Sequence, residues 1–127
     1  MNPSTKIYKT AFWGAIIGLF ILSSLPDIPA NKTFQTDEST FRFDYLFHFL
    51  AYFVIGMLYV MAYKPNLTGI ILITGYAALE EIHQYWIPGR TLNPVDLGFD
   101  LAGLAAVAVV WWIGLRKKLE VRRQRSG

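Results

Sequence analysis

The sequence DYLFHFLAYFVIGMLYVMAY, residues 44–63, combines a long apolar run with regularly spaced polar residues. It has the length, about 20 residues, that a helix needs to cross the hydrocarbon core of a bilayer. Its polar side chains are ordered, because Asp44, His48 and Tyr52 recur at every fourth residue and form one stripe along a helix. This combination indicates a membrane helix whose polar face is turned toward other helices rather than toward lipid.

The rest of the chain is also more apolar than a soluble domain of this size. Hydrophobic residues make up 54% and aromatic residues 16% of its 127 residues, which indicates a small integral membrane protein. The sequence contains no cysteine, which excludes disulfides, thiolate metal ligands and cysteine nucleophiles. We predict an all-α membrane protein with four transmembrane helices, at about 10–25, 45–63, 67–86 and 97–115.

Turn and charge signals predict how this single domain, residues 1–127, is organised. The polar segment 26–43 should be an extracytoplasmic loop, and the turn Lys64-Pro65-Asn66 should make the second and third helices an antiparallel hairpin. Basic residues gather before the first helix, at Lys64 and in a cytoplasmic tail at 116–127. The positive-inside rule therefore predicts that both termini are cytoplasmic.

The first apolar stretch has a second interpretation as a cleaved signal peptide. Lys6 and Lys9 precede it, and it ends in the small residues Ser23-Ser24. Against cleavage, Leu25-Pro26 is a poor cleavage site, and the Gly14-x-x-x-Gly18 spacing suits close packing between membrane helices. We therefore expect a retained helix.

Polar residues of three predicted helices fall at a similar depth, toward the outer surface. Because lipid-facing carboxylates are costly, these polar faces should meet inside the bundle. Arg90, in a Pro-Gly-Arg turn, could bind a carboxylate or a phosphate with its planar guanidinium. The sequence does not decide whether Glu80 or Glu81 faces the polar pocket that these helices would enclose, because the two residues are about 100° apart on a helix. The candidate ligand-binding residues are Asp44, His48, Tyr52, Glu81, Gln84, Arg90, Asp96 and Asp100.

The same residues also allow two other interpretations. They could form a hydrogen-bond network that only holds three helices in register. A metal site built from His48, Glu81 and Asp100 is chemically permissible, but Glu80-Glu81-Ile82-His83 lacks the second histidine of a His-Glu-x-x-His helix. We expect neither a metal nor a cofactor. The sequence assigns no catalytic residue.

In chain order, four pieces of this constellation resemble the VanZ-like family of small bacterial membrane proteins. They are Asp44-x-x-x-His48-Phe49-x-x-Tyr52, Glu81-x-x-Gln84, Pro88-Gly89-Arg90 and Asp96-x-x-x-Asp100-x-x-Gly103, within about Asp44 to Ala108. The resemblance implies four helices in the bacterial cytoplasmic (inner) membrane and a link to resistance against the lipoglycopeptide teicoplanin. The family pattern has a lysine where this chain has Tyr45 and an asparagine where it has Asp100.

The leading hypothesis is an outer-leaflet polar pocket that binds an envelope lipid or a polar head group. One alternative is an intramembrane hydrolase or transferase that uses glutamate and histidine on an envelope lipid. Another is a structural or accessory subunit of a larger membrane complex. Expected partners are membrane lipids, a cell-envelope precursor or lipoglycopeptide, and other membrane subunits. Nucleic acid is not expected, because the positive-inside effect alone accounts for the basic tail.

Overall fold

Four α-helices form most of the computed structural model, which describes residues 2–26, 43–90 and 92–127. They are α1 (Pro3–Ser23), α2 (Phe43–Ala62), α3 (Leu67–Gln84) and α4 (Pro94–Arg125). Asn2, Asn66 and Asn93 cap α1, α3 and α4, each accepting a hydrogen bond from a backbone N–H of the first turn. The predicted loop at 26–43 lies outside the described residues except for its two ends.

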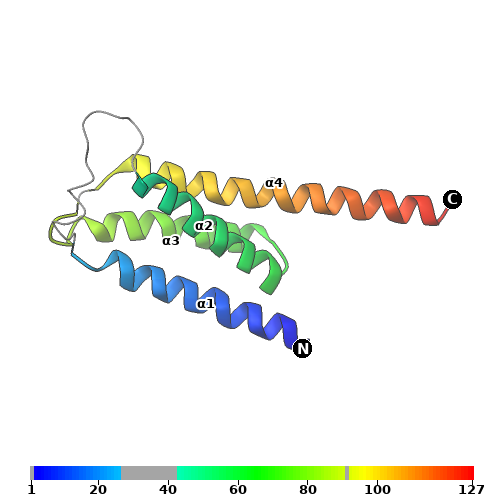
Figure 1. Cartoon of the computed structure of the whole chain (residues 1–127), viewed down its shortest axis with the longest axis horizontal. Helices are drawn as coiled ribbons and strands as arrows, with labels where there is room; N and C mark the ends of the chain where they lie inside the picture. Colours follow the sequence, from blue (N-terminus) through cyan, green and yellow to red (C-terminus); the bar gives the residue numbers. More distant parts are fainter. Residues whose placement is uncertain (1, 27–42, 91) are drawn as a thin grey trace.

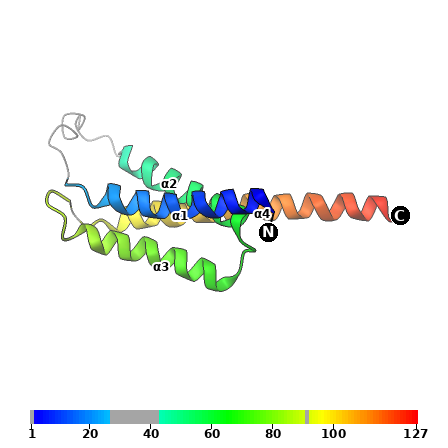
Figure 2. The same ribbon diagram turned by 90° about the horizontal axis from the view of Figure 1, so that it is seen from below.

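The helices lie side by side with alternating directions (Figures 1 and 2). α2 packs against α4 and α1, and α3 packs against α4 and, sparsely, against α1. Among the described residues, no α-carbon of α2 lies within 8 Å of one of α3. The turn at 64–66 does reverse the chain, but the prediction of a hairpin was wrong about adjacency, because α2 and α3 occupy opposite corners of the bundle.

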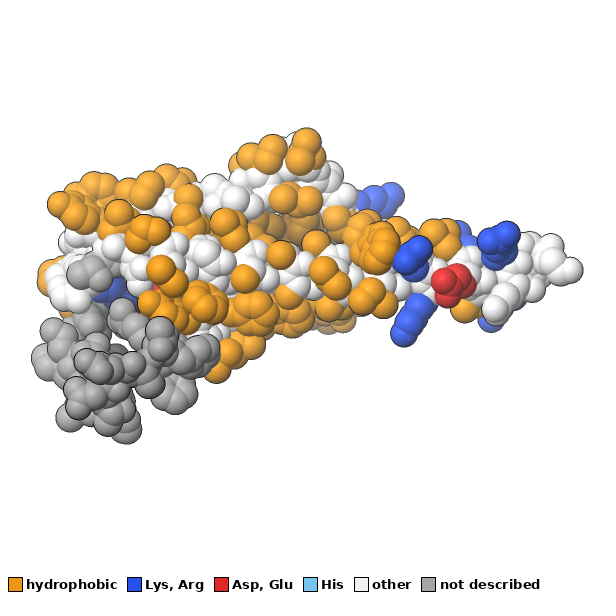
Figure 3. Space-filling model, turned by 90° about the horizontal axis from the view of Figure 1, so that it is seen from above, with side chains coloured by type: hydrophobic (Ala, Val, Ile, Leu, Met, Phe, Trp, Pro, Cys, Tyr) orange, Lys and Arg blue, Asp and Glu red, His pale blue; other side chains and the backbone are white. Residues whose placement is uncertain are grey.

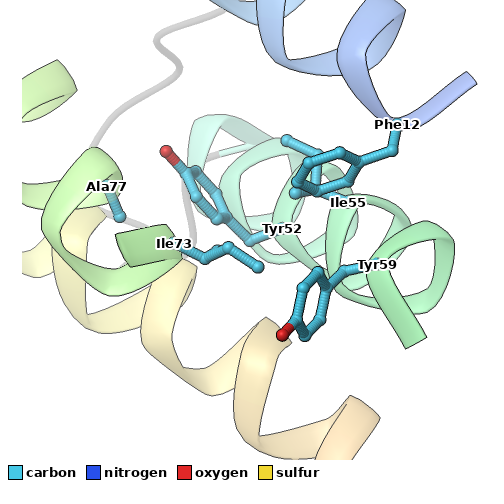
Figure 4. Packing of buried hydrophobic residues seen from close by; sticks show 6 residues of the cluster. All are labelled: Phe12, Tyr52, Ile55, Tyr59, Ile73 and Ala77. Carbon is cyan, nitrogen blue, oxygen red and sulfur yellow. The ribbon is translucent and has the colours of Figure 1, made fainter. Parts of the chain in front are cut away.

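The core of the bundle fills the space between these two opposite helices. Tyr52, Ile55 and Tyr59 of α2 meet Ile73 and Ala77 of α3, and Phe12 of α1 covers them from the side (Figure 4). Aromatic side chains are long enough to bridge two backbones that do not touch. α1 is therefore an integral part of the bundle.

α2 and α4 approach more closely than any other pair, because α4 carries a glycine at the crossing. A Cβ at Gly103 would overlap the carbonyl oxygen of Phe49 in α2. Small residues at such crossings are typical of helices that pack inside membranes.

Large apolar side chains cover the outside of the bundle (Figure 3). Three of the described helices, α1, α2 and α4, are long and apolar enough to cross a membrane. α3 has 18 residues, about 27 Å of helix, but its end is too polar for the same assignment by composition. The fourth predicted span therefore rests on the position of α3 beside the other helices (Figures 1 and 2).

Two predicted boundaries need correction. α1 begins at Pro3 rather than near residue 10. α4 continues to Arg125 and includes most of the predicted tail, so that its basic end projects beyond the bundle (Figures 1 and 3). Leucine, lysine, arginine, glutamate and glutamine all favour helix, which explains why the charged segment prolongs α4.

Candidate functional site

Three helices bring polar side chains together at the end of the bundle where α3 ends and α4 begins. We call this group the acidic cluster and this end the polar end. Glu80, Glu81, Gln84 and Asp100 are each at most 5% exposed. The predicted meeting of three polar helix faces is thus present in the structure. The acidic cluster consists of His48 and Tyr52 (α2), Glu80, Glu81 and Gln84 (α3), and Asp96 and Asp100 (α4).

His48 lies between two aspartates of α4. Its Nδ1 is 2.8 Å from Oδ1 of Asp100, and its Nε2 is 3.7 Å from Oδ2 of Asp96. The two aspartates are four residues apart and so share one face of α4. A carboxylate on Nδ1 fixes the orientation of the imidazole and leaves Nε2 as its second polar atom.

Tyr52 reaches across the bundle to α3. Its hydroxyl donates a hydrogen bond of 2.6 Å to Oε2 of Glu80, and its side chain is only 1% exposed. Glu80 was not among the eight predicted binding residues, yet it lies inside the cluster beside Glu81. Both glutamates are buried in the bundle, Glu80 against Tyr52 of α2 and Glu81 against Asn93 at the start of α4.

Glu81 is held from the start of α4. Its Oε1 accepts a hydrogen bond of 2.5 Å from the backbone N–H of Asn93. The Asn93 side chain caps α4 through Val95 and donates to Oδ1 of Asp96 at 3.4 Å. No sequence signal predicts the contact between Asn93 and Glu81.

Two carboxylate oxygens of the cluster have no hydrogen-bond partner in the described structure. They are Oε1 of Glu80 and Oε2 of Glu81, and both are fully buried. Each belongs to a glutamate whose other oxygen is paired. A buried acceptor without a donor is costly, which makes these two atoms the positions where a ligand donor would be most favourable.

Arg90 is placed away from these glutamates. Its Nε donates to the backbone oxygen of Leu25 at 3.1 Å, and its terminal nitrogen donates to that of Leu22 at 3.5 Å. Gly89 precedes it with a positive φ of 80°, a conformation that glycine adopts readily. Arg90 thus caps the carbonyl end of α1.

A second contact holds the end of α1 near the same place. Nε2 of His83 in α3 lies 3.0 Å from Oγ of Ser24, and the His83 ring stacks on Phe20.

Asp44, predicted as part of the site, lies exposed in the first turn of α2.

A sequence match to a known family shows which family this chain belongs to. The model of the VanZ/LLP1 family matches residues 3–115. The chain belongs to the VanZ/LLP1 family. No curated protein and no solved structure matches it.

The VanZ/LLP1 match confirms the resemblance and extends it. It begins at the first residue of α1, so α1 belongs to the family's domain, in agreement with the burial of Phe12 in the core. Apolar helices and family membership together identify a membrane protein.

The chemistry open to this VanZ/LLP1 site follows from its donor set. Among the described residues, no three histidine, aspartate or glutamate side chains are arranged to hold one metal ion. No lysine or arginine in the described ranges pairs with Glu80, Glu81 or Asp100. The buried part of the cluster therefore accepts hydrogen bonds and suits a donor or a cation better than an anion.

Proposed function

We propose that this VanZ/LLP1 protein binds the head group of an envelope lipid at the acidic cluster. The head group donates hydrogen bonds to Glu80 and Glu81. The observation that carries the proposal is the pair of buried, unpartnered oxygens, Oε1 of Glu80 and Oε2 of Glu81. A membrane protein meets lipid head groups at the ends of its helices, where these residues lie.

The negative charge of the acidic cluster determines which class of head group would bind there. Glu80, Glu81 and Asp100 have no lysine or arginine partner in the described part of the chain, and the guanidinium of Arg90 is used at the end of α1. A phosphate alone would add negative charge to this site and supply no donor. An amine or several hydroxyl groups supply donors, so aminolipids and glycolipids fit the cluster.

The proposed location is the bacterial cytoplasmic membrane, with the acidic cluster in the outer leaflet. Lys6, Lys9 and Lys64 lie toward the opposite end of the bundle, as does the basic end of α4, which the positive-inside rule assigns to the cytoplasm. A lipid held at the outer surface would alter how lipoglycopeptide antibiotics of the teicoplanin type engage the membrane. Such an effect would link lipid binding at the acidic cluster to the teicoplanin resistance that the family resemblance implies.

A second candidate, an intramembrane hydrolase or transferase, is favoured by one contact. Asp100 orients His48 through Nδ1, as a general base requires, and Nε2 would take a proton from water or a lipid hydroxyl. His48→Gln separates the two functions. An enzyme would lose turnover of a bound lipid, whereas a binding protein has no turnover to lose.

Native mass spectrometry of the solubilised full chain tests the proposed function. The protein is incubated with phosphatidylethanolamine and phosphatidylcholine of identical acyl chains, which differ in whether the head-group nitrogen carries hydrogens. We expect about tenfold preferential retention of phosphatidylethanolamine, or of a diglucosyl lipid if hydroxyl groups are the donors. Equal retention of phosphatidylethanolamine, phosphatidylcholine and a diglucosyl lipid offered in the same way would refute the proposal.

Glu81→Gln is the matched variant for this experiment. The amide oxygen still accepts from Asn93, so the start of α4 is kept, but the amide NH₂ faces the head group with donors instead of an acceptor. We expect the lipid preference to disappear. Glu120→Gln changes an exposed carboxylate on the projecting part of α4 and should leave the preference intact.

A further inference from the structure

An apolar groove lies between α2, α3 and α4. Its volume is about 610 Å³, and its walls include Gly56 and Tyr59 of α2, Ile73 of α3, and Leu104 and Trp111 of α4. The groove opens because α2 and α3 stand at opposite corners, and because small residues such as Gly56 and Ala108 line it. Its surface is almost entirely apolar.

The groove uses the same three helices as the acidic cluster, and on α2 and α4 its lining begins within about one helical turn of the cluster. Gly56 follows Tyr52 by four residues, and Leu104 follows Asp100 by four residues, which is about 6 Å along each helix. On α3, Ile73 precedes Glu80 by about two turns. A molecule with a polar group at the cluster and an apolar group pointing into the bundle would contact both regions.

The surroundings favour a hydrocarbon chain in the groove. The groove runs along membrane-crossing helices, so its walls lie at the depth of lipid acyl chains rather than of water. Water against these walls would hydrate apolar surface, whereas a hydrocarbon chain would bury it. Within a bilayer, lipid chains are the apolar molecules that are always present.

We propose that the groove holds one hydrocarbon chain of the same lipid whose head group lies at the acidic cluster. The inference rests on the proposed function and adds the second half of the ligand. The protein would then contact both the head group and one acyl chain of an aminolipid or glycolipid. A head group without an acyl chain would bind much more weakly.

Photo-crosslinking tests this inference with a phosphatidylethanolamine that carries a diazirine in one acyl chain. The full-length protein is loaded, unbound lipid is removed in detergent, and the cross-linked residues are identified by peptide mass spectrometry. We expect labels on groove residues such as Tyr59, Thr74 and Ala108. Labels confined to outward residues such as Leu72 or Val110, which are exposed and do not line the groove, would overturn the inference.

Two matched variants place a tryptophan on opposite faces of α4. Ala108→Trp fills the groove, and Val110→Trp adds the same ring on the outer face, about 200° away around the helix. We expect about tenfold less retained probe for Ala108→Trp and no change for Val110→Trp. Normal lipid retention by a folded Ala108→Trp protein, or a changed oligomeric state instead, would count against a lipid chain.

The outcomes for the two proposals differ. If the head-group site is correct and the chain site is wrong, Glu81→Gln loses the probe and Ala108→Trp keeps it. If the chain site is correct and the head-group site is wrong, Ala108→Trp loses the probe while Glu81→Gln keeps it and phosphatidylcholine binds as well as phosphatidylethanolamine. The labelled positions in the unmodified protein provide a readout that depends on no variant.

Discussion

At the scale of single residues, the polar groups of the acidic cluster are positioned by partners on other helices. Tyr52 of α2 donates to Glu80 of α3, and Glu81 accepts from the backbone of Asn93 at the start of α4. Hydrogen bonds between membrane helices stabilise modestly, by about 0.6 kcal/mol on average. Their larger effect here is to direct one oxygen of each glutamate away from its partner and into the cluster.

Removing one hydroxyl should show how strongly Glu80 depends on its partner. Tyr52→Phe leaves the Glu80 carboxylate buried without its donor, and we expect a loss of about 1–3 kcal/mol in the free energy of unfolding. Equilibrium unfolding in mixed micelles with sodium dodecyl sulfate measures it. Tyr59→Phe is the control, because the Tyr59 hydroxyl makes no hydrogen bond among the described residues. Equal effects of the two variants would contradict this assignment.

Asp100 offers a second test at this scale. Asp100→Asn keeps an oxygen near Nδ1 of His48, so we expect a change in the unfolding free energy below about 1 kcal/mol. Asp100→Leu leaves Nδ1 of the partly buried His48 imidazole without its partner and should cost about 1–3 kcal/mol. The same unfolding assay separates the two variants. A larger loss for asparagine than for leucine would mean that the contact does not stabilise the bundle.

Some of these positions could be predicted from the sequence and others could not. The i, i+4 spacing of Asp96 and Asp100 places them on one helix face, and the cost of exposing carboxylates to lipid predicts that this face turns toward the other helices. The direction of Arg90 could not be predicted, because it depends on the backbone turn at Gly89 and on which helix end lies nearby. The Glu81 contact uses a backbone N–H, which has no side-chain signature.

At the scale of helices, the closest approach in the bundle depends on one glycine. Gly103 lets α4 reach the backbone of α2 at Phe49, next to the aspartates that hold His48. The second feature at this scale is the end of α1, which is tied to α3 and the following turn by His83 and Arg90. These contacts hold the helices around the cluster without taking part in it.

Gly103→Ala should push α2 and α4 apart. The added methyl group would meet the Phe49 backbone, which cannot rotate away as a side chain can, so we expect a loss of about 1–3 kcal/mol in unfolding free energy. Gly114→Ala is the matched control on the same helix, because nothing lies within 4 Å of its Cβ position. It should be neutral or stabilise by up to about 1 kcal/mol. A tolerated alanine at 103 would show that the crossing is looser than described.

Arg90→Gln tests the assignment of this residue to α1. Losing the guanidinium removes the Arg90 hydrogen bond to the Leu25 carbonyl and one of the two hydrogen bonds to the Leu22 carbonyl, which also accepts from the backbone N–H of Leu25, so amide exchange in the last turn of α1 should speed up severalfold. Hydrogen exchange followed by mass spectrometry measures this change. Lipid retention should stay normal. If retention fell while α1 kept its protection, Arg90 would belong to the binding site, as the sequence predicted.

At the scale of the whole molecule, the two ends of the bundle have opposite chemical character. The polar end carries buried carboxylates, and the other end carries the chain termini and the basic part of α4 (Figures 1 and 3). Helix number and most helix positions followed from hydropathy and turn signals. The diagonal placement of α2 and α3 did not, because it depends on how side chains such as Tyr52 and Tyr59 fill the interior.

Cysteine labelling tests the orientation and the crossing of α3 together. The sequence has no cysteine, so single substitutions of Ser4, Lys64, Ser126 and Leu92 each give one reporter. We expect the first three to react from the cytoplasmic side and Leu92→Cys to react from outside. A membrane-impermeant maleimide applied to intact cells and to inverted vesicles measures this. If Lys64→Cys and Leu92→Cys react from the same side, α3 does not cross the membrane.

Binding of a lipid head group at the acidic cluster would be seen in a crystal structure of the protein grown in a lipid phase that contains phosphatidylethanolamine. We expect a head-group donor at about 2.7–3.2 Å from Oε1 of Glu80 or Oε2 of Glu81. Head-group binding would be ruled out if both oxygens were paired with groups of the protein itself, such as a guanidinium turned inward from Arg90, and no head group lay at the cluster.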